Sequence, residues 1–175
     1  MAEIATNQIH ALLTEVGRRY QQPATLLLLG GGALRLLGSS RPTLDLDYVG
    51  HDLHKTALQQ VVEQVAQEMQ LEVEAVPIEE FVPLPDDAQE RRLVVGQFGT
   101  IDVNILDPYT IALSKIDRGF ETDLEDILFL IQQGLVTLAK LESVVADAAL
   151  RAQEFDLSPT ALREHLQDLR NRLSL

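Results

Sequence analysis

Two aspartates one residue apart, Asp45 and Asp47, have the spacing in this sequence that most clearly indicates chemistry. Side chains alternate along a strand, so both carboxylates face the same side, about 7 Å apart along the backbone. A third aspartate, Asp102, lies in a later apolar segment, where an unpaired carboxylate is costly. Converging carboxylates repel one another, and a hard divalent cation relieves that repulsion. We therefore predict a metal site made of Asp45, Asp47 and Asp102, although the first two alone would also fit a solvated strand face.

A run of three glycines, Gly30 to Gly32, follows an apolar segment and precedes the two aspartates. Glycine has no Cβ, so backbone N–H groups in such a turn can come close to a phosphate. The run lacks the spacing of a dinucleotide-binding motif and the lysine of a Walker A loop, and by itself it fits a simple tight turn better than a phosphate-binding turn. Combined with metal-binding acids, it predicts phosphoryl or nucleotidyl transfer.

The composition limits the class of protein. A chain of 175 residues that is 46% hydrophobic suffices for one globular domain with a small helical appendage. Its net charge of -13 repels nucleic acid and anionic membranes, and the absence of cysteine excludes disulfides and thiolate metal sites. The N-terminus has no signal-peptide pattern, and the apolar run at residues 26–29 is far too short to cross a membrane. We expect a cytoplasmic protein with no membrane partner.

Hydrophobic spacing predicts an α+β fold, with a mixed sheet of about five strands and flanking helices. The sheet and most helices would form a domain over residues 1–134, and residues 135–175 a helical C-terminal extension packed on it. A tight turn is expected around residues 97–99, and a loop over 79–89. Helices are expected at 4–19, 33–37, 54–70, 109–117, 121–132, 136–152 and 158–173, and strands at 25–29, 43–49, 71–78, 91–95 and 100–106.

The residues singled out above form a recognisable set with the segment between them. Leu29-Gly30-Gly31 is followed by Arg41-x-Thr43-x-Asp45-x-Asp47 and later by Asp102. This set resembles the nucleotidyltransferase superfamily, whose fold is that of DNA polymerase beta. The run over residues 30–47, together with 113–118 and 123–127, is similar to small bacterial nucleotidyltransferases of the AbiEii and DUF6036 types. The resemblance covers roughly residues 25 to 130.

The resemblance implies an enzyme that moves a nucleoside monophosphate from an NTP to a hydroxyl acceptor and releases pyrophosphate. Magnesium would be the cofactor, with manganese as an alternative, and the three aspartates would be both its ligands and the catalytic residues. The acceptor is open between a small molecule, a protein and RNA, as is the base of the NTP. The implied nucleotide-binding residues are Gly30, Gly31, Arg41, Thr43, Lys115 and Arg118.

Two alternatives stay open at this point. Lys115 and Arg118 share a helix face and could instead form ordinary ion pairs with Asp123 or Glu121, and Arg41 could be a solvated loop residue. The whole chain could also be a toxin-antitoxin component that acts mainly by binding a cognate partner protein, with a degenerate or regulatory nucleotide site. The sequence leaves the oligomeric state open under either hypothesis.

Overall fold

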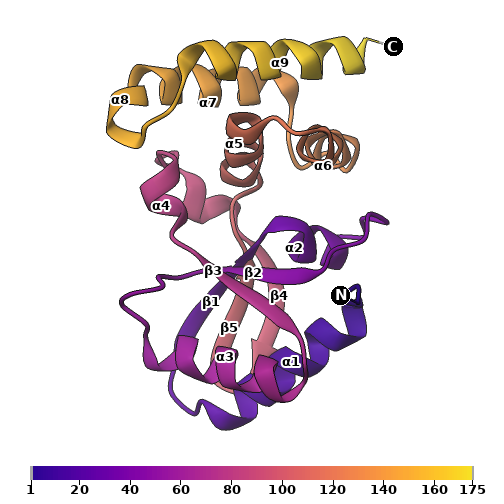
Figure 1. Ribbon diagram of the computed structural model, residues 1–175, viewed down its shortest axis with the longest axis vertical. Helices are drawn as coiled ribbons and strands as arrows, with labels where there is room; N and C mark the ends of the chain where they lie inside the picture. The colour runs from indigo at the N-terminus through magenta and orange to yellow at the C-terminus, as the bar shows by residue number, and fades with distance from the viewer. Residues whose placement is uncertain (1, 175) are drawn as a thin grey trace. The chain divides into compact units, whose positions relative to one another are not determined.

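A five-stranded mixed sheet in the order β3-β2-β1-β5-β4 forms the centre of the first of two units (Figure 1). The computed structural model describes residues 2–174. Strand β1 is antiparallel to β2 and parallel to β5, while β2 is parallel to β3 and β4 is antiparallel to β5. This arrangement confirms the predicted α+β class and the mixed sheet of about five strands.

The first unit extends to Pro77 and also includes Arg92–Leu106. The β4–β5 hairpin turns at Gly99, which has a φ of +62°, so residues 97 and 98 belong to β4 and not to the predicted turn. The elements of this unit are α1 (Thr6–Arg19), β1 (Ala24–Leu29), α2 (Gly30–Leu36), β2 (Asp45–Val49), α3 (Ala57–Glu68), β3 (Glu72–Val76), β4 (Leu93–Phe98) and β5 (Ile101–Ile105).

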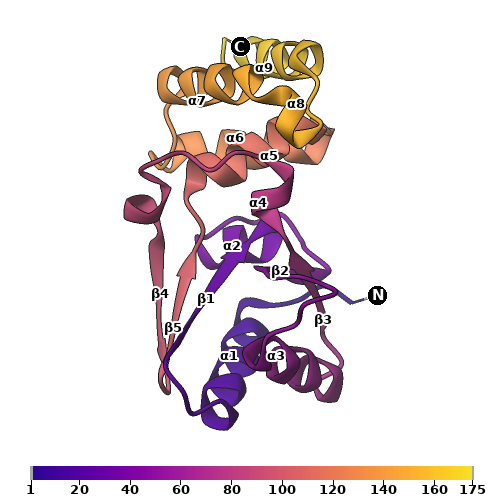
Figure 2. The ribbon, with the colours of Figure 1, turned by 90° about the vertical axis from the view of Figure 1, so that its left-hand side faces the viewer.

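One face of this sheet is apolar and buried. Helices α1 and α3 lie side by side, α1 contacting β4 and α3 contacting β3 (Figure 2). Burial of these side chains supplies the main driving force for folding of the unit, because apolar area is removed from water. The buried side chains include Leu26 and Leu28 of β1, Leu46 and Tyr48 of β2, Ile101, Val103 and Ile105 of β5, and Leu12, Leu13, Val16, Val62 and Val65 of the helices.

The second unit is helical and comprises Ile78–Arg91 and the chain from Asp107 onward. The predicted boundary at residue 134 therefore falls inside this unit, between α6 and α7. Helix α5 contacts α6, α7 and α9, and eight of its eleven residues are buried (Figure 1). The elements are α4 (Ile78–Phe81), the 3-10 helix η1 (Ala88–Arg91), α5 (Pro108–Arg118), α6 (Glu121–Gln132), α7 (Leu138–Leu150), α8 (Ala152–Phe155) and α9 (Pro159–Leu173).

Asp107 fixes the start of α5. Its buried carboxylate accepts hydrogen bonds from the backbone N–H groups of Tyr109 and Thr110, and Pro108 occupies the first helical turn. Arg91 donates two further hydrogen bonds of 2.7 Å to the same carboxylate, which ties η1 to α5. The segment predicted as a loop over residues 79–89 thus contains α4 and leads into η1. None of the helices within residues 2–174 has the length and apolar character needed to cross a membrane.

Asp117 gives the second unit a testable pH dependence. Burial raises the pKa of this carboxyl above 3.8, opposed by the charges of His165 and Arg118. The folded state then binds more protons than the unfolded state, so this group lowers stability as pH rises from 3.8 to the raised pKa. We expect Asp117→Asn to raise the free energy of unfolding at neutral pH and to change it little below pH 3.8. Urea denaturation at both pH values checks this, and an equal gain at both would contradict it.

Candidate metal centre

Carboxylates from two neighbouring strands converge on the face of the sheet opposite to the buried one. Strands β2 and β3 run parallel, with Asp45 beside Glu72 and Asp47 beside Glu74, so all four side chains point to the same side. Oxygens of Asp45, Asp47 and Glu74 all lie within 4.8 Å of one another. The two aspartates are half-buried and the glutamate is exposed.

This donor set fits a hard divalent cation. Three carboxylates at such separation repel one another, and this repulsion is relieved either by protonation or by a bound cation. Magnesium and manganese prefer oxygen ligands of this kind. The exposed side of the cluster leaves room for further oxygen ligands from water or from a phosphate. The three carboxylates can therefore serve as protein ligands of one ion.

The glycine run packs directly against the strand that carries the aspartates. Gly30 has a φ of +72°, and a Cβ atom built there would lie 2.2 Å from Asp47 Oδ2. At Gly31, a Cβ would meet Thr43 Oγ1 at 2.8 Å and Arg41 Nη2 at 3.2 Å. Only glycine permits this close approach. Gly30 thus lies against Asp47, and Gly31 lies against Thr43 and Arg41.

Helix α2 begins at Gly30 itself and not at Ala33, because the glycines form its first turn against β2. The strand begins later than predicted, at Asp45, since the preceding residues form a connector. Within that connector the buried Thr43 donates a hydrogen bond of 3.2 Å to the backbone oxygen of Asp45, and its own backbone oxygen accepts from Ile4 N–H at 2.8 Å. These bonds hold the start of β2 in place.

We expect Gly30→Ala to weaken both the fold and the metal site. An alanine at this positive φ is strained by about 1–2 kcal/mol, and its Cβ would displace the Asp47 carboxylate. Gly38→Ala is the matched control, since Gly38 has a φ of +104° and a Cβ there would meet no atom within 4 Å. Urea denaturation and Mn²⁺ titration measure the two effects. If Gly30→Ala bound Mn²⁺ with wild-type affinity, the close approach of Gly30 to Asp47 would not be the reason for a glycine at this position.

Asp102 is not part of the cluster. It shares the open face with Asp47, but it pairs with Thr25 of β1, whereas Asp47 pairs with Leu29. Four residues along β1 correspond to about 13 Å. Asp102 is also exposed, so its place in an apolar segment carries no burial cost that a metal would have to relieve.

Lys115 and Arg118 belong to the second unit, where both form ion pairs. Lys115 is 4% exposed, and its Nζ lies 2.7 Å from Asp126 Oδ2 and 3.8 Å from Asp123 Oδ1. Arg118 Nη2 lies 2.5 Å from Asp123 Oδ1. This geometry matches the ion-pair alternative, and Asp126 joins Asp123 as a partner of these two basic side chains. A contact between Lys115 and a phosphate would require its ammonium group to leave two buried carboxylates.

Comparison with known protein families identifies the family to which the chain belongs. The model of the DUF6036 family, described as a nucleotidyltransferase of unknown function, matches residues 5–165. The chain belongs to the DUF6036 family. This confirms the resemblance inferred from the glycine run and the two aspartates. No curated protein and no solved structure matched the chain.

Glu74 is the residue of this DUF6036 chain that sequence reasoning missed. The segment Glu72-Val73-Glu74 repeats the acid alternation of Asp45-Leu46-Asp47, and that pattern is the signal that could have identified it. The signal is local to each strand, however, and its meaning depends on β3 lying beside β2 in parallel register. Strand order therefore makes Glu74, and not Asp102, the third carboxylate of the cluster.

Proposed function

We propose that this DUF6036 nucleotidyltransferase moves a nucleoside monophosphate from an NTP to a hydroxyl acceptor and releases pyrophosphate. The observation that carries the proposal is the convergence of Asp45, Asp47 and Glu74 next to the Gly30 turn. In the transfer, the acceptor oxygen forms a bond to the α-phosphorus, and the bond from that phosphorus to the bridging oxygen breaks. The electron pair leaves with pyrophosphate.

Asp45, Asp47 and Glu74 would hold the divalent cation, magnesium in the first instance and manganese as the alternative. When bound, the ion supplies charge stabilisation for the phosphate oxygens. A metal-binding site of carboxylates alone gives the negatively charged triphosphate no attraction in the absence of the ion. NTP binding should therefore depend on the metal.

The remaining residues at the turn have roles that follow from their positions. Gly30 and Gly31 would let backbone N–H groups approach the phosphates, because no Cβ blocks the way. Arg41, whose Nη2 lies against Gly31, would add a positive charge there, and Thr43 holds the backbone of Asp45 in register. Glu74, the most exposed acid of the cluster, would accept the proton of the acceptor hydroxyl.

Lys115 and Arg118 stand outside this proposal. Their positive charges are already matched by Asp126 and Asp123. The buried lysine therefore neutralises acidic side chains inside the helical unit, which is a structural role. The net charge of -13 also favours a small-molecule or protein acceptor over RNA, since phosphate contacts dominate nucleic-acid affinity.

The test has two stages. Calorimetry with ATP, CTP, GTP and UTP, each with and without Mg²⁺, measures metal-dependent binding and identifies the base. The preferred NTP, labelled at its α-phosphate, is then incubated with separated small-molecule, protein and RNA fractions of a cell extract. Label should transfer to one fraction, with pyrophosphate released. Absence of both NTP binding and label transfer to any fraction would refute the proposal.

A further inference from the structure

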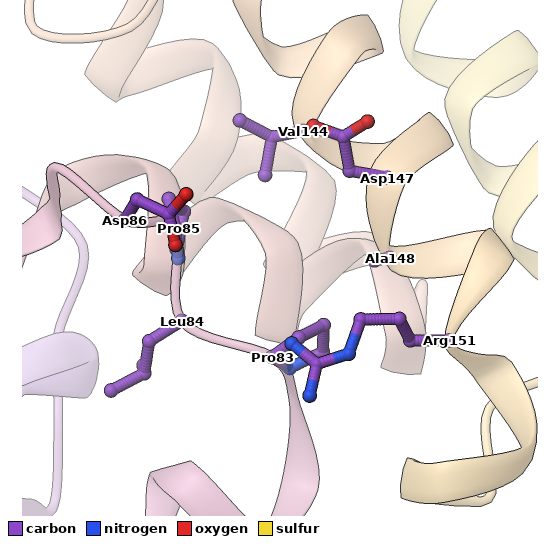
Figure 3. A pocket seen from close by; sticks show the side chains of 8 residues that line it. All are labelled: Pro83, Leu84, Pro85, Asp86, Val144, Asp147, Ala148 and Arg151. Carbon is purple, nitrogen blue, oxygen red and sulfur yellow. The ribbon is translucent and has the colours of Figure 1, made fainter.

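A hollow of about 210 Å³ lies within the second unit, between α7 and the segment that precedes η1 (Figure 3). Val144, Asp147 and Ala148 are spaced three and four residues apart and share one side of α7. They face a segment that contains two prolines, Pro83 and Pro85. The lining residues are Pro83, Leu84, Pro85, Asp86, Val144, Asp147, Ala148 and Arg151.

Two exposed leucines lie at or next to the residues that line this hollow in the sequence. Leu84 at its edge is 42% exposed, and Leu150 nearby is 86% exposed. Leu150 lines a second hollow of about 430 Å³ at the end of α7, and Arg151 is common to both. Exposed apolar side chains around a hollow are typical of a binding surface. A binding partner would remove these side chains from water, which the folded chain alone does not do.

The rim of the first hollow carries two carboxylates without a salt-bridge partner. Within the described part of the chain, neither Asp86 nor Asp147 has a basic nitrogen within 4.0 Å, whereas the neighbouring Asp87 pairs with Arg91 and Lys140. Arg151 Nη2 is 2.8 Å from Glu154 Oε2, so its charge is largely matched, and Asp86 acts on it only at longer range. The rim therefore attracts a positive charge.

The geometry points to a segment of a partner polypeptide as the occupant, with an apolar side chain in the hollow and lysine or arginine beside it. Small-molecule sites commonly measure about 300–1,000 Å³, so this hollow suits a single side chain better than a whole cofactor. From Val144 to Arg151 a helix rises about 10 Å, which three extended residues span. Anchoring of one apolar side chain, with charges at the rim, is a common basis of protein recognition.

The experiment uses a five-residue probe, acetyl-Lys-Phe-Lys-Leu-Lys-amide, titrated into the isotopically labelled full chain and followed by NMR. Two control peptides separate the contributions: one has glutamates in place of the lysines, and the other has serines in place of the apolar residues. The double variant Asp86→Lys with Asp147→Lys reverses the rim charge. Its matched control is Glu164→Lys with Asp168→Lys, which makes the same charge change at exposed positions on α9.

We expect the lysine–apolar peptide alone to shift the resonances of residues 83–86 and 144–151. The rim variant should weaken its binding by roughly tenfold, since two attractions become repulsions, while the α9 variant should bind as wild type does. Binding that survives rim reversal, that is equal for the glutamate peptide, or that shifts other residues would overturn the proposal. Absence of binding at millimolar peptide would overturn it as well.

Discussion

Replacing Asp45 and Asp47 together with asparagine should abolish metal-dependent NTP binding and lower nucleotide transfer by roughly a thousandfold or more. Both carboxylates lie within 4.8 Å of Glu74, so their replacement removes two of three ligands from one ion. Asparagine has the same shape and retains one oxygen per side chain, but it carries no charge. Calorimetry with the preferred NTP and the transfer assay measure the two losses separately.

The fold should survive this double replacement. The two aspartates are half-buried and repel each other in the metal-free protein, so removing their charges relieves strain between like charges. Because asparagine has nearly the same volume as aspartate, we expect a free energy of unfolding close to that of the wild type when no metal is present. An inactive variant that is also unfolded would not support the assignment, and full activity in a folded variant would refute it.

Glu74→Gln and Asp102→Asn form a matched pair that decides which residue is the third acid. Each neutralises one exposed carboxylate on the open face of the same sheet. Only Glu74 lies in the cluster, so Glu74→Gln should weaken metal binding by about ten- to a hundredfold and Asp102→Asn should leave it unchanged. The reverse result would restore Asp102 as a ligand and remove Glu74.

The paired aspartates and the glycine turn were predictable because their geometry is local. The two-residue period of a strand determines that Asp45 and Asp47 share a face, whatever that strand pairs with. The turn follows the strand directly, so its place beside them requires only that β1 and β2 be neighbours. Local spacing was therefore sufficient to place Asp45 and Asp47 on one face, and the approach of the turn needed the pairing of β1 with β2 as well.

The third carboxylate could not be predicted in this way. Asp102 lies on a mainly apolar strand and Glu74 on a strand that alternates acids with apolar residues, and each would face the acids in some arrangement of the sheet. Which of the two joins the cluster depends on strand order and register. Glu74 of β3 pairs directly with Asp47 of β2, whereas Asp102 of β5 pairs with β1 four residues away from the residue that pairs with Asp47. Such long-range pairing leaves little trace in the spacing of one sequence.

The division of the chain illustrates the same limit. Periodicity located the long helices but missed the short α4, η1 and α8, and it could not show that residues 78–91 belong with the C-terminal helices. One contact that joins them is made by the side chain of Arg91, which hydrogen-bonds the Asp107 carboxylate at the start of α5, sixteen residues ahead. An arginine and an aspartate at that separation have no recognisable spacing, so the contact appears only in three dimensions.

The second large effect is the loss of stability expected when Lys115 is replaced. It distinguishes a structural role of this lysine from a nucleotide-binding role. Lys115→Met should lower the free energy of unfolding by about 3–5 kcal/mol, because Asp126, only 2% exposed, would remain buried without its lysine. Lys140→Met is the control in the same unit. Lys140 pairs with Asp87 at the surface, where both side chains are more than 40% exposed, and its loss should change stability little.

Double replacement of the pair tests the role directly. Lys115→Met with Asp126→Leu removes both buried charges, so most of the lost stability should return. If the pair is purely structural, the double variant should also bind the preferred NTP with wild-type affinity. A stable double variant that no longer binds NTP would mean that Lys115 contacts the triphosphate and exchanges Asp126 for it.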